Sequence, residues 1–376
     1  MQLQRDSSFL VKLSLVLFII IAAGFILYIG QDILVPIALA GLLAVLLLPA
    51  NRFLEKRIGR VASILISLVV FFLLFGTLLY FLITQITGFI DDIPTIKRQL
   101  NKHLYTVQRW VYENFHLTRK EQSKFIEEGT TQIKETNGGG GIIGKTFLSL
   151  TEFLFVVILM PIYTFLILYY RDMIRQFLVD LFKTDHRQKV FEVINESRVI
   201  VYNYMVGLSI EMAIITAINT IGFLIVGIKY ALFLGLLSAV LNLIPYVGML
   251  IASIFCMLVT LTSSQDLTDI IWVLVVLLVV QFFDNNIIMP KVVGSKVKIN
   301  ALITILGVVI GGALCGLSGM FLSIPIIAIM KVIFDRVDGL KPWGRMLGDE
   351  ISYSHKLRLY RRLADRKTKK ELKATA

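Results

Sequence analysis

A few ionisable and amide side chains lie within or at the end of long apolar stretches of this sequence, where such groups are costly. Glu211 and Asn219 lie two helical turns apart in one stretch, and Asp284 and Asn285 end another. Ionisable groups at membrane depth indicate a substrate or ion pathway by default. Two simpler interpretations are open: Glu211 is a carboxyl held neutral by burial or paired with a lysine, and Asp284 caps a helix end at the interface.

Backbone breakers interrupt the same apolar stretches. They occur in N-L-I-P-Y-V-G, D-N-N-I-I-M-P and G-G-A-L-C-G-L-S-G, which begin at Asn242, Asp284 and Gly311. Backbone in lipid must satisfy its own hydrogen bonds, so broken helices occur where they are buried in protein or line a cavity. The predicted hinge or broken-helix residues are Pro245, Gly248, Pro290, Gly294, Gly311, Gly312, Gly316, Gly319 and Pro325.

Two motifs that match enzyme patterns do not support an enzyme. Gly139–Thr146 fits the P-loop expression, but polar residues precede it where a buried strand is required, so a glycine hinge with a snorkelling Lys145 is the better interpretation. The G-L-S-G serine motif at Gly316–Gly319 needs a base, and all four histidines lie outside the apolar windows. No His, Cys and carboxylate spacing suits a metal. The sequence predicts no catalytic residue, no cofactor and no metal site.

Composition places these residues in a membrane protein. Of the 376 residues, 56% are hydrophobic and 17% charged, and the mean hydropathy is +0.78, too apolar for an ordinary soluble protein. A membrane helix needs about 20 apolar residues. We therefore predict an all-α polytopic membrane protein with eight hydrophobic segments, at Phe9–Ile29, Ile33–Ala50, Val61–Gly88, Phe147–Tyr170, Tyr202–Ile228, Ala231–Thr262, Ile270–Phe283 and Ala301–Phe334.

The net charge of +12 is explained by lipid rather than by nucleic acid. Lysine and arginine cluster at the N-terminus, in the predicted loop Asn51–Arg60, in Arg171–Arg198 and in the tail. The positive-inside rule places all four clusters, and both termini, on the cytoplasmic side of the inner membrane. The expected partners are therefore the lipid bilayer and a small-molecule or ion substrate, with no nucleic acid. The first window is too long for a cleaved signal peptide and is expected to be retained.

Simple counting of spans conflicts with this charge rule in the last third of the chain. Four plain spans would place the acidic segment Gln265–Asp269 inside and the basic segment Lys291–Lys298 outside. The conflict disappears if windows six and eight, each over 30 residues long with breakers near the middle, are re-entrant hairpins. Two hairpins of opposite orientation are typical of alternating-access transporters.

Five regions follow from this topology. Residues 1–88 are predicted to form N-terminal transmembrane hairpins, and 89–146 an extracytoplasmic polar helical insertion. Residues 147–202 combine a transmembrane helix with a cytoplasmic amphipathic segment. Residues 203–335 form a transport core with broken helices, and 336–376 a basic cytoplasmic tail.

The chain resembles the autoinducer-2 exporter family of permeases over nearly its whole length. The resemblance is sharpest in I-P-Y-V-G ending at Gly248, in N-x-x-x-x-P-x-x-x-G from Asn285 to Gly294, and in G-G-A-x-x-G-x-x-G followed by Pro325. Ala301 replaces a common family proline after the basic segment. The resemblance implies secondary transport without ATP and a homo-oligomer such as a pentamer. Implied substrates are signalling molecules in some members and sodium or lithium exchanged for protons in others.

We therefore interpret the chain as a secondary transporter, a permease or exporter of a small polar molecule such as an autoinducer-2-like signal. A monovalent cation/proton antiporter and a non-transporting membrane scaffold are the alternatives. Tyr246 could close the site with its ring, although tyrosines that anchor in the interface are equally common. The predicted substrate-binding residues are Glu211, Asn219, Asn242, Tyr246, Asp284 and Asn285.

Overall fold

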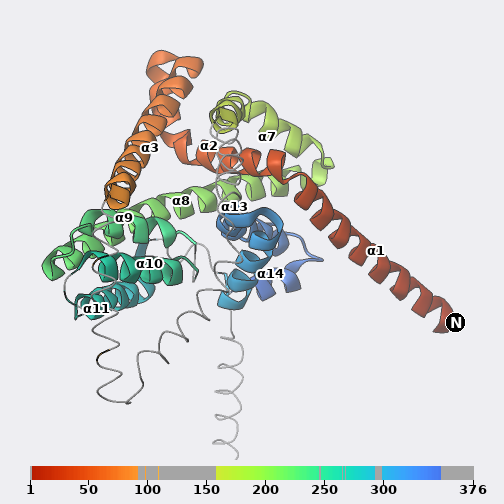
Figure 1. Cartoon of the computed structure of the whole chain (residues 1–376). Helices are drawn as coiled ribbons and strands as arrows, with labels where there is room; N and C mark the ends of the chain where they lie inside the picture. The colour runs from red at the N-terminus through yellow and green to blue at the C-terminus, as the bar shows by residue number, and fades with distance from the viewer. Residues whose placement is uncertain are drawn as a thin grey trace, which may run out of the picture.

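The computed structural model describes residues 2–91, 98, 109, 158–244, 247–264, 266, 268–292 and 299–348. Within these residues every regular element is a helix, and an isolated β-bridge joins Ile299 to Gly348. The predicted all-α class is therefore confirmed. The labelled helices (Figure 1) are α1 Gln2–Ile29, α2 Gln31–Ile58, α3 Arg60–Asp91, α7 Arg171–Asp180, α8 Thr184–Val226, α9 Ala231–Leu241, α10 Val247–Ser263, α11 Thr268–Phe283, the π-helix η1 Asp284–Ile288, α12 Met289–Val292, α13 Ala301–Arg336 and α14 Lys341–Leu347.

Five helices in the described ranges are long and apolar enough to cross a membrane. They are α2, α3, α8, the continuous run of α11 with η1 and α12, and α13. Shorter apolar helices cover Ser14–Ile29, Ile158–Tyr169, Ala231–Leu241 and Val247–Leu261. The chain is therefore a multi-pass membrane protein, whereas the count of eight segments remains a prediction. Most of the predicted insertion (89–146), the P-loop-like motif and residues 349–376 of the predicted tail lie outside the described residues.

A sharp corner joins α2 to α3, where the sequence pattern predicted a basic loop over Asn51–Arg60. That loop prediction is wrong, because both helices continue through it and leave only Gly59 between them. Gly59 has a φ of 79°, which glycine adopts without steric cost. Arg171 holds the corner from α7 by donating to Asn51 Oδ1 at 3.1 Å and pairing with Glu55 at 2.6 Å.

The longest element is α8, whose 43 residues span about 65 Å at 1.5 Å per residue. This is about twice the thickness of a hydrocarbon core, so a large part of α8 must extend beyond it. Its charged beginning binds the end of α13, because Arg336 contacts Glu192 at 2.9 Å and Glu196 at 2.8 Å. The beginning of α8 and the end of α13 therefore lie at the same end of the molecule.

The predicted sixth window is broken into two helices, α9 and α10. Residues 242–244 form turns between them, while Pro245 and Tyr246 lie outside the described residues. Gly248, in the first turn of α10, lies against Leu241: a Cβ there would be 2.5 Å from the Leu241 carbonyl carbon. Phe233 of α9 also packs edge-on against Phe255 of α10, with ring centroids 6.3 Å apart. The two helices are therefore antiparallel neighbours.

The backbone of α13 also folds back on itself. Cys315 and Gly316 have non-helical angles, and Gly316 has a φ of 59°. A Cβ on Gly311 would lie 2.8 Å from the carbonyl carbon of Gly319, although eight residues of straight helix span about 12 Å. Gly307 likewise approaches the side chain of Ile327. The residues before and after Gly316 thus form two limbs that pack side by side.

The start and end of α13 are held at one end of the molecule by α14 and α8. The Asn300 side chain accepts a hydrogen bond from Ile303 N at 2.9 Å, which caps α13. Its amide nitrogen donates to Met346 O at 2.7 Å, which ties the cap to α14. The start of the first limb and the end of the second limb therefore lie at the same end of the molecule, beside α14.

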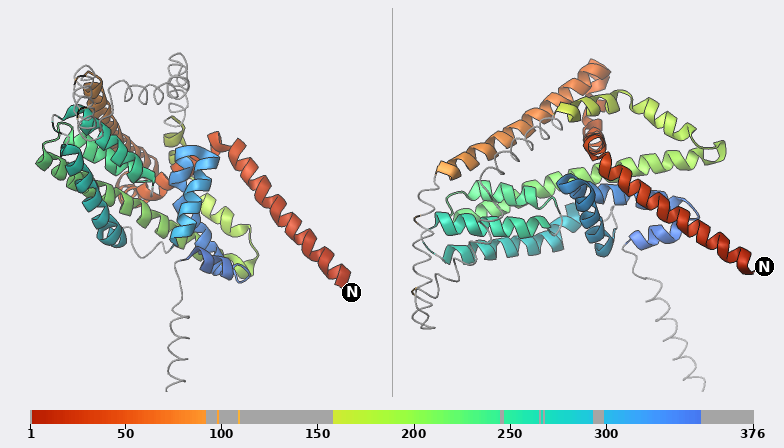
Figure 2. Two further views of the ribbon diagram at one scale, coloured as in Figure 1. Left: turned by 60° about the horizontal axis from the view of Figure 1, so that its bottom comes forward. Right: turned by 45° about the vertical axis from the view of Figure 1, so that its right-hand side comes forward.

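The main apolar core lies where α8, α9, α10 and α11 pack together. These four helices run side by side in the right-hand view of Figure 2, whereas α1 projects away from the rest. The core residues include the fully buried Phe223, Leu234 and Val273, which come from three different helices. This core lies between the end of α8 and the start of α11, and the polar residues Glu211 and Asp284 lie further along the same two helices.

Candidate functional site

The candidate site begins with a buried stripe along α8. Tyr204, Leu208, Glu211, Ile215 and Asn219 recur at spacings of three and four residues, and all five are buried. Such spacing places them on one face of the helix. Glu211 is 7% exposed and Asn219 is 2% exposed, so the stripe carries two strongly polar groups into the packed interior.

Opposite Glu211, the end of α11 supplies a second acid. Asp284 is 2% exposed and is the first residue of the π-helix η1. A π-helix rotates its side chains relative to an α-helix, and short ones occur frequently at functional sites. The Glu211 and Asp284 carboxyl groups are close enough for their charges to interact. Two helices distant in sequence thus bring two buried acids together.

The break between α9 and α10 completes this arrangement. Asn242 follows the last residue of α9, and its Nδ2 donates to Asp284 Oδ2 at 3.1 Å. Asp284 therefore bonds to the tip of the α9–α10 pair and does not act as the helix cap that the sequence left open. One turn earlier in α9, Ser238 Oγ accepts from Asn219 Nδ2 at 2.8 Å. These two hydrogen bonds connect α9 to α11 and to α8.

Several oxygen atoms of the site have no hydrogen-bond partner in the part of the chain that the structure describes. They are Glu211 Oε2, Asp284 Oδ1 and Asn219 Oδ1, and each is buried. Buried polar atoms in folded proteins are nearly always satisfied, so an unsatisfied group needs an explanation. The carboxyl oxygens of Glu211 and Asp284 suit a ligand that donates hydrogen bonds or carries positive charge, and Asn219 Oδ1 lies two helical turns further along the same face of α8.

No described lysine or arginine forms an ion pair with Glu211 or Asp284. The open interpretation of Glu211 as an acid paired with lysine therefore receives no support among the described residues. An uncompensated buried charge costs several kcal/mol, so two neighbouring acids need a proton or a cation. The arrangement can thus exchange protons, bind a cation or hold a polar solute.

The remaining predicted site residues lie differently. Asn285 is exposed on η1, where its Oδ1 accepts from Gln281 Nε2 at 3.1 Å, and it is not brought into the cluster. Tyr246 lies outside the described residues. The structure therefore brings together Glu211, Asn219, Asn242 and Asp284.

Two further residues belong to this neighbourhood, and the sequence analysis missed both. Ser238 bridges Asn219 to the Gly235 carbonyl, and Tyr204 lies two turns before Glu211 on the same face. The spacing from Tyr204 to Asn219 could have been read from the sequence. Ser238 offered a weaker signal, because small hydroxyl residues are common within membrane helices.

The predicted hinge residues lie partly in the described ranges. Gly248 opens α10, Pro290 lies in α12, and Gly311, Gly312, Gly316 and Gly319 surround the fold in α13. Pro325 is buried in the second limb of α13, and Gly294 lies outside the described residues. No group of three metal-binding side chains occurs among the described residues.

Comparison with known proteins groups this chain with transport proteins. A family model described as "AI-2E family transporter" matches residues 15–339. "Putative transport protein YrrI" of Bacillus subtilis (strain 168) is 27% identical over 314 residues, covering 81% of this chain and 86% of the relative. "Putative transport protein YhhT" of Escherichia coli (strain K12) is 22% identical over 356 residues, covering 90% and 94%.

Proposed function

This chain belongs to the AI-2E transporter family, and we propose that it is a secondary transporter moving a small polar solute across the cytoplasmic membrane without ATP. The observation that carries this proposal is the hydrogen bond of Asn242 to Asp284 at the break between α9 and α10, with the buried Glu211 within electrostatic range of Asp284. Broken helices at such depth are the usual location of a transport site.

The depth of the site supports a transport role. Glu211 lies about 24 Å along α8 from its end near Gly227, and Asp284 lies about 24 Å along α11 from its start. The 11 residues of α9 span about 16 Å, which is shorter than a hydrocarbon core of about 30 Å. The α9–α10 tip therefore ends within the membrane in this proposal, near both acids.

The two folded segments suit alternating access. In our proposal, α9 and α10 enter and leave from the outer face, while both limbs of α13 enter from the cytoplasmic face. The ion pairs of Arg336 with Glu192 and Glu196 support this orientation, because they hold the end of α13 to the charged half of α8, which follows the Lys- and Arg-containing segment predicted to lie inside. Movement of one hairpin relative to the other would open the site to one side at a time.

Cysteine labelling tests this orientation. In a background that lacks Cys256 and Cys315, we expect an impermeant thiol reagent on intact cells to label a cysteine at Ser264 and not one at Ser295. Ser264 lies at the end of α10, and Ser295 lies in the predicted inner segment. Labelling at Ser295 without labelling at Ser264 would contradict the two hairpins and restore four plain spans.

A cation/proton antiporter is the second candidate, and a specific feature favours it. Glu211 and Asp284 share one buried neighbourhood without a described basic partner. A monovalent cation and protons could alternate at such a pair, because either would neutralise the buried charge. An autoinducer-2-like furanone is a candidate substrate only because of the name of the family.

Flux through proteoliposomes separates these functions. We expect solute movement that depends on protein and on an imposed proton gradient. Proton movement driven by sodium or lithium would assign the antiporter, and uptake of a labelled furanone would assign the exporter. An absence of flux for every solute and gradient tested would contradict both the antiporter and the exporter. The non-transporting membrane scaffold would then be the remaining interpretation. The homo-oligomer is a further proposal, to be tested by the mass of the purified protein.

A further inference from the structure

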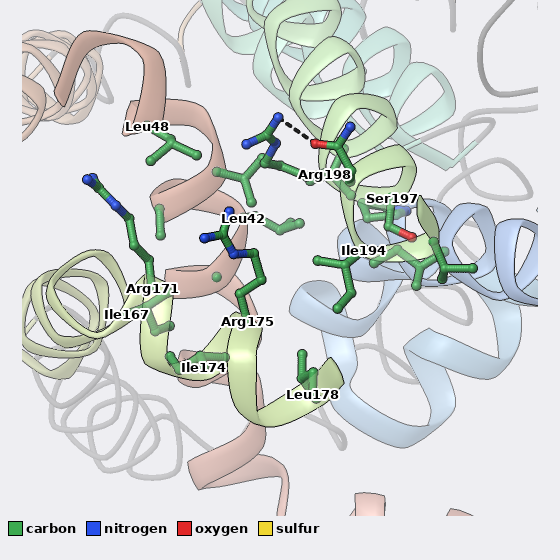
Figure 3. A pocket seen from close by; sticks show the side chains of 18 of the residues that line it. Leu42, Leu48, Ile167, Arg171, Ile174, Arg175, Leu178, Ile194, Ser197 and Arg198 are labelled. Carbon is green, nitrogen blue, oxygen red and sulfur yellow. Dashed lines mark hydrogen bonds between the residues drawn. The ribbon is translucent and has the colours of Figure 1, made fainter. Parts of the chain in front are cut away.

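A cavity with both polar and apolar walls lies away from Glu211, between α2, α7, α8 and α13. Its volume is about 560 Å³, within the range of about 300–1,000 Å³ that is usual for ligand pockets. Figure 3 shows Arg175 of α7 and Arg198 of α8 reaching toward one another inside it. Arg52 of α2 lines the same cavity.

The arginines of this cavity are not balanced by acids. Arg171 is paired with Glu55 at 2.6 Å, but Asp172 is shared by Arg60, Arg171 and Arg175 at 3.2–3.7 Å. Among the described residues, Arg198 donates only to the neutral Asn195, at 2.8 Å, and Arg52 forms no ion pair.

Arg198 also lies within electrostatic range of both Arg52 and Arg175. Like charges repel, so three guanidinium groups near one another favour an anionic ligand. Guanidinium groups hydrogen-bond phosphate in a geometry that is often bidentate. The Ser197 hydroxyl, buried without a described partner, adds a possible donor.

The rest of the cavity wall is apolar, which requires a ligand with a hydrocarbon part. Leu42 and Leu48 of α2 and Ile326 and Ile329 of α13 line it. Ile174 and Leu178 of α7 complete the wall, and the neighbouring Met173 and Phe177 are 61% and 60% exposed. A short helix with apolar side chains exposed in this way is typical of the membrane interface.

The position along α8 matches the headgroup region. Arg198 lies about 43 Å along α8 from Gly227, and a bilayer with its headgroups is about 40–45 Å thick. If the end of α8 near Gly227 lies at one surface, Arg198 lies at the other. The basic residues assign that surface to the cytoplasmic leaflet. A second cavity of about 430 Å³ shares Arg52 and Arg198 and adds Lys56, extending the basic surface along α2.

We propose that this cavity binds one anionic phospholipid of the cytoplasmic leaflet. The phosphate lies between Arg52, Arg175 and Arg198, and an acyl chain lies along the apolar wall between α2 and α13. A soluble phosphate would use the arginines alone and would leave this wall unoccupied. The bound lipid would connect α2 and α7 to the second limb of α13.

Native mass spectrometry of the purified chain in uncharged detergent tests this. We expect retention of one phosphatidylglycerol per chain in preference to phosphatidylcholine. Basic residues contribute about 1 kcal/mol each toward anionic lipid, so replacing two should weaken retention roughly thirtyfold. The test variant is Arg52→Gln with Arg198→Gln, which leaves no described acid without its partner. Arg187→Gln is the control, since Arg187 lies on α8 outside the cavity and pairs with Asp180.

A shape variant and a phosphate competition separate lipid from a soluble anion. Ile329→Trp fills the apolar wall without changing charge, and we expect it to reduce phosphatidylglycerol retention as well. If the double variant does not fold, Arg52→Gln alone replaces it as the test variant, because Arg52 is exposed. Equal retention by the arginine variants and the Arg187 control would overturn the proposal. So would displacement of the lipid by equimolar inorganic phosphate, or unchanged retention in Ile329→Trp.

Discussion

Replacing Gly319 with valine should abolish transport and lower the thermal stability of the protein. A Cβ at Gly319 would lie 2.7 Å from the carbonyl carbon of Gly311 and 2.8 Å from Cys315 Cβ. These are backbone and near-backbone atoms, so the two limbs of α13 would have to separate. Overpacking of this kind costs about 1–3 kcal/mol or more. Proteoliposome flux and a thermal unfolding midpoint would measure both effects.

Two glycine variants are matched controls for Gly319→Val. Gly307→Ala adds a Cβ against the flexible tip of the Ile327 side chain, which can move, and should cost little. Gly76→Ala, in α3, meets nothing within 4 Å and should be neutral or slightly stabilising. Normal flux and stability in Gly319→Val would show that the close contact between the α13 limbs is not required for transport.

Glu211→Gln should remove the pH dependence of transport while keeping the shape of the site. Glutamine has nearly the same size, but it cannot gain or lose a proton in this range. An uncompensated buried charge costs several kcal/mol, and about 1.4 kcal/mol of activation free energy corresponds to a tenfold change in rate. We therefore expect the flux of the unmodified protein to change about tenfold or more with pH, and that of the variant to stay nearly constant. Initial rates in proteoliposomes between acidic and neutral pH would measure this.

Three comparisons make the Glu211 result interpretable. Asp32→Asn, at an exposed carboxyl near the start of α2, should leave the pH dependence intact. Asp284→Asn should alter flux as well, because Asp284 accepts from Asn242 and neighbours Glu211. Loss of expression or stability in Glu211→Gln without a change in the flux of the remaining protein would indicate that Glu211 stabilises the fold. Unchanged flux with unchanged pH dependence would remove Glu211 from the mechanism and leave Asp284 as the remaining acid.

Hydropathy and residue type were sufficient for the coarse architecture. Apolar length alone predicted a multi-pass helical protein, because the bilayer requires long segments with internally satisfied backbone. The Pro and Gly clusters predicted interruptions, and the backbone is interrupted near Asn242 and at Cys315 and Gly316. The cost of a buried carboxyl selected Glu211 and Asp284, since few ionisable residues occur in the apolar windows.

Side-chain partners could not be predicted from the same information. Membrane helices are apolar on nearly every face, so periodicity does not show which face packs against which neighbour. The pairing of Asn242 with Asp284, the bridge from Asn219 to Ser238 and the exposure of Asn285 all depend on that choice. The helix α8 also continues through the predicted boundary at Tyr202, and it contacts α2 and α13.

The sequence by itself determined which residues must lie in the membrane and which of them are too costly there to be incidental. Only the tertiary structure decided that Glu211 lies within electrostatic range of Asp284, that Gly311 lies against Gly319, and that Arg52 and Arg198 share a cavity. The physical reason is that burial in lipid depends on the composition of each segment alone. Contact between segments depends on close packing and hydrogen bonds between residues that are far apart in the chain.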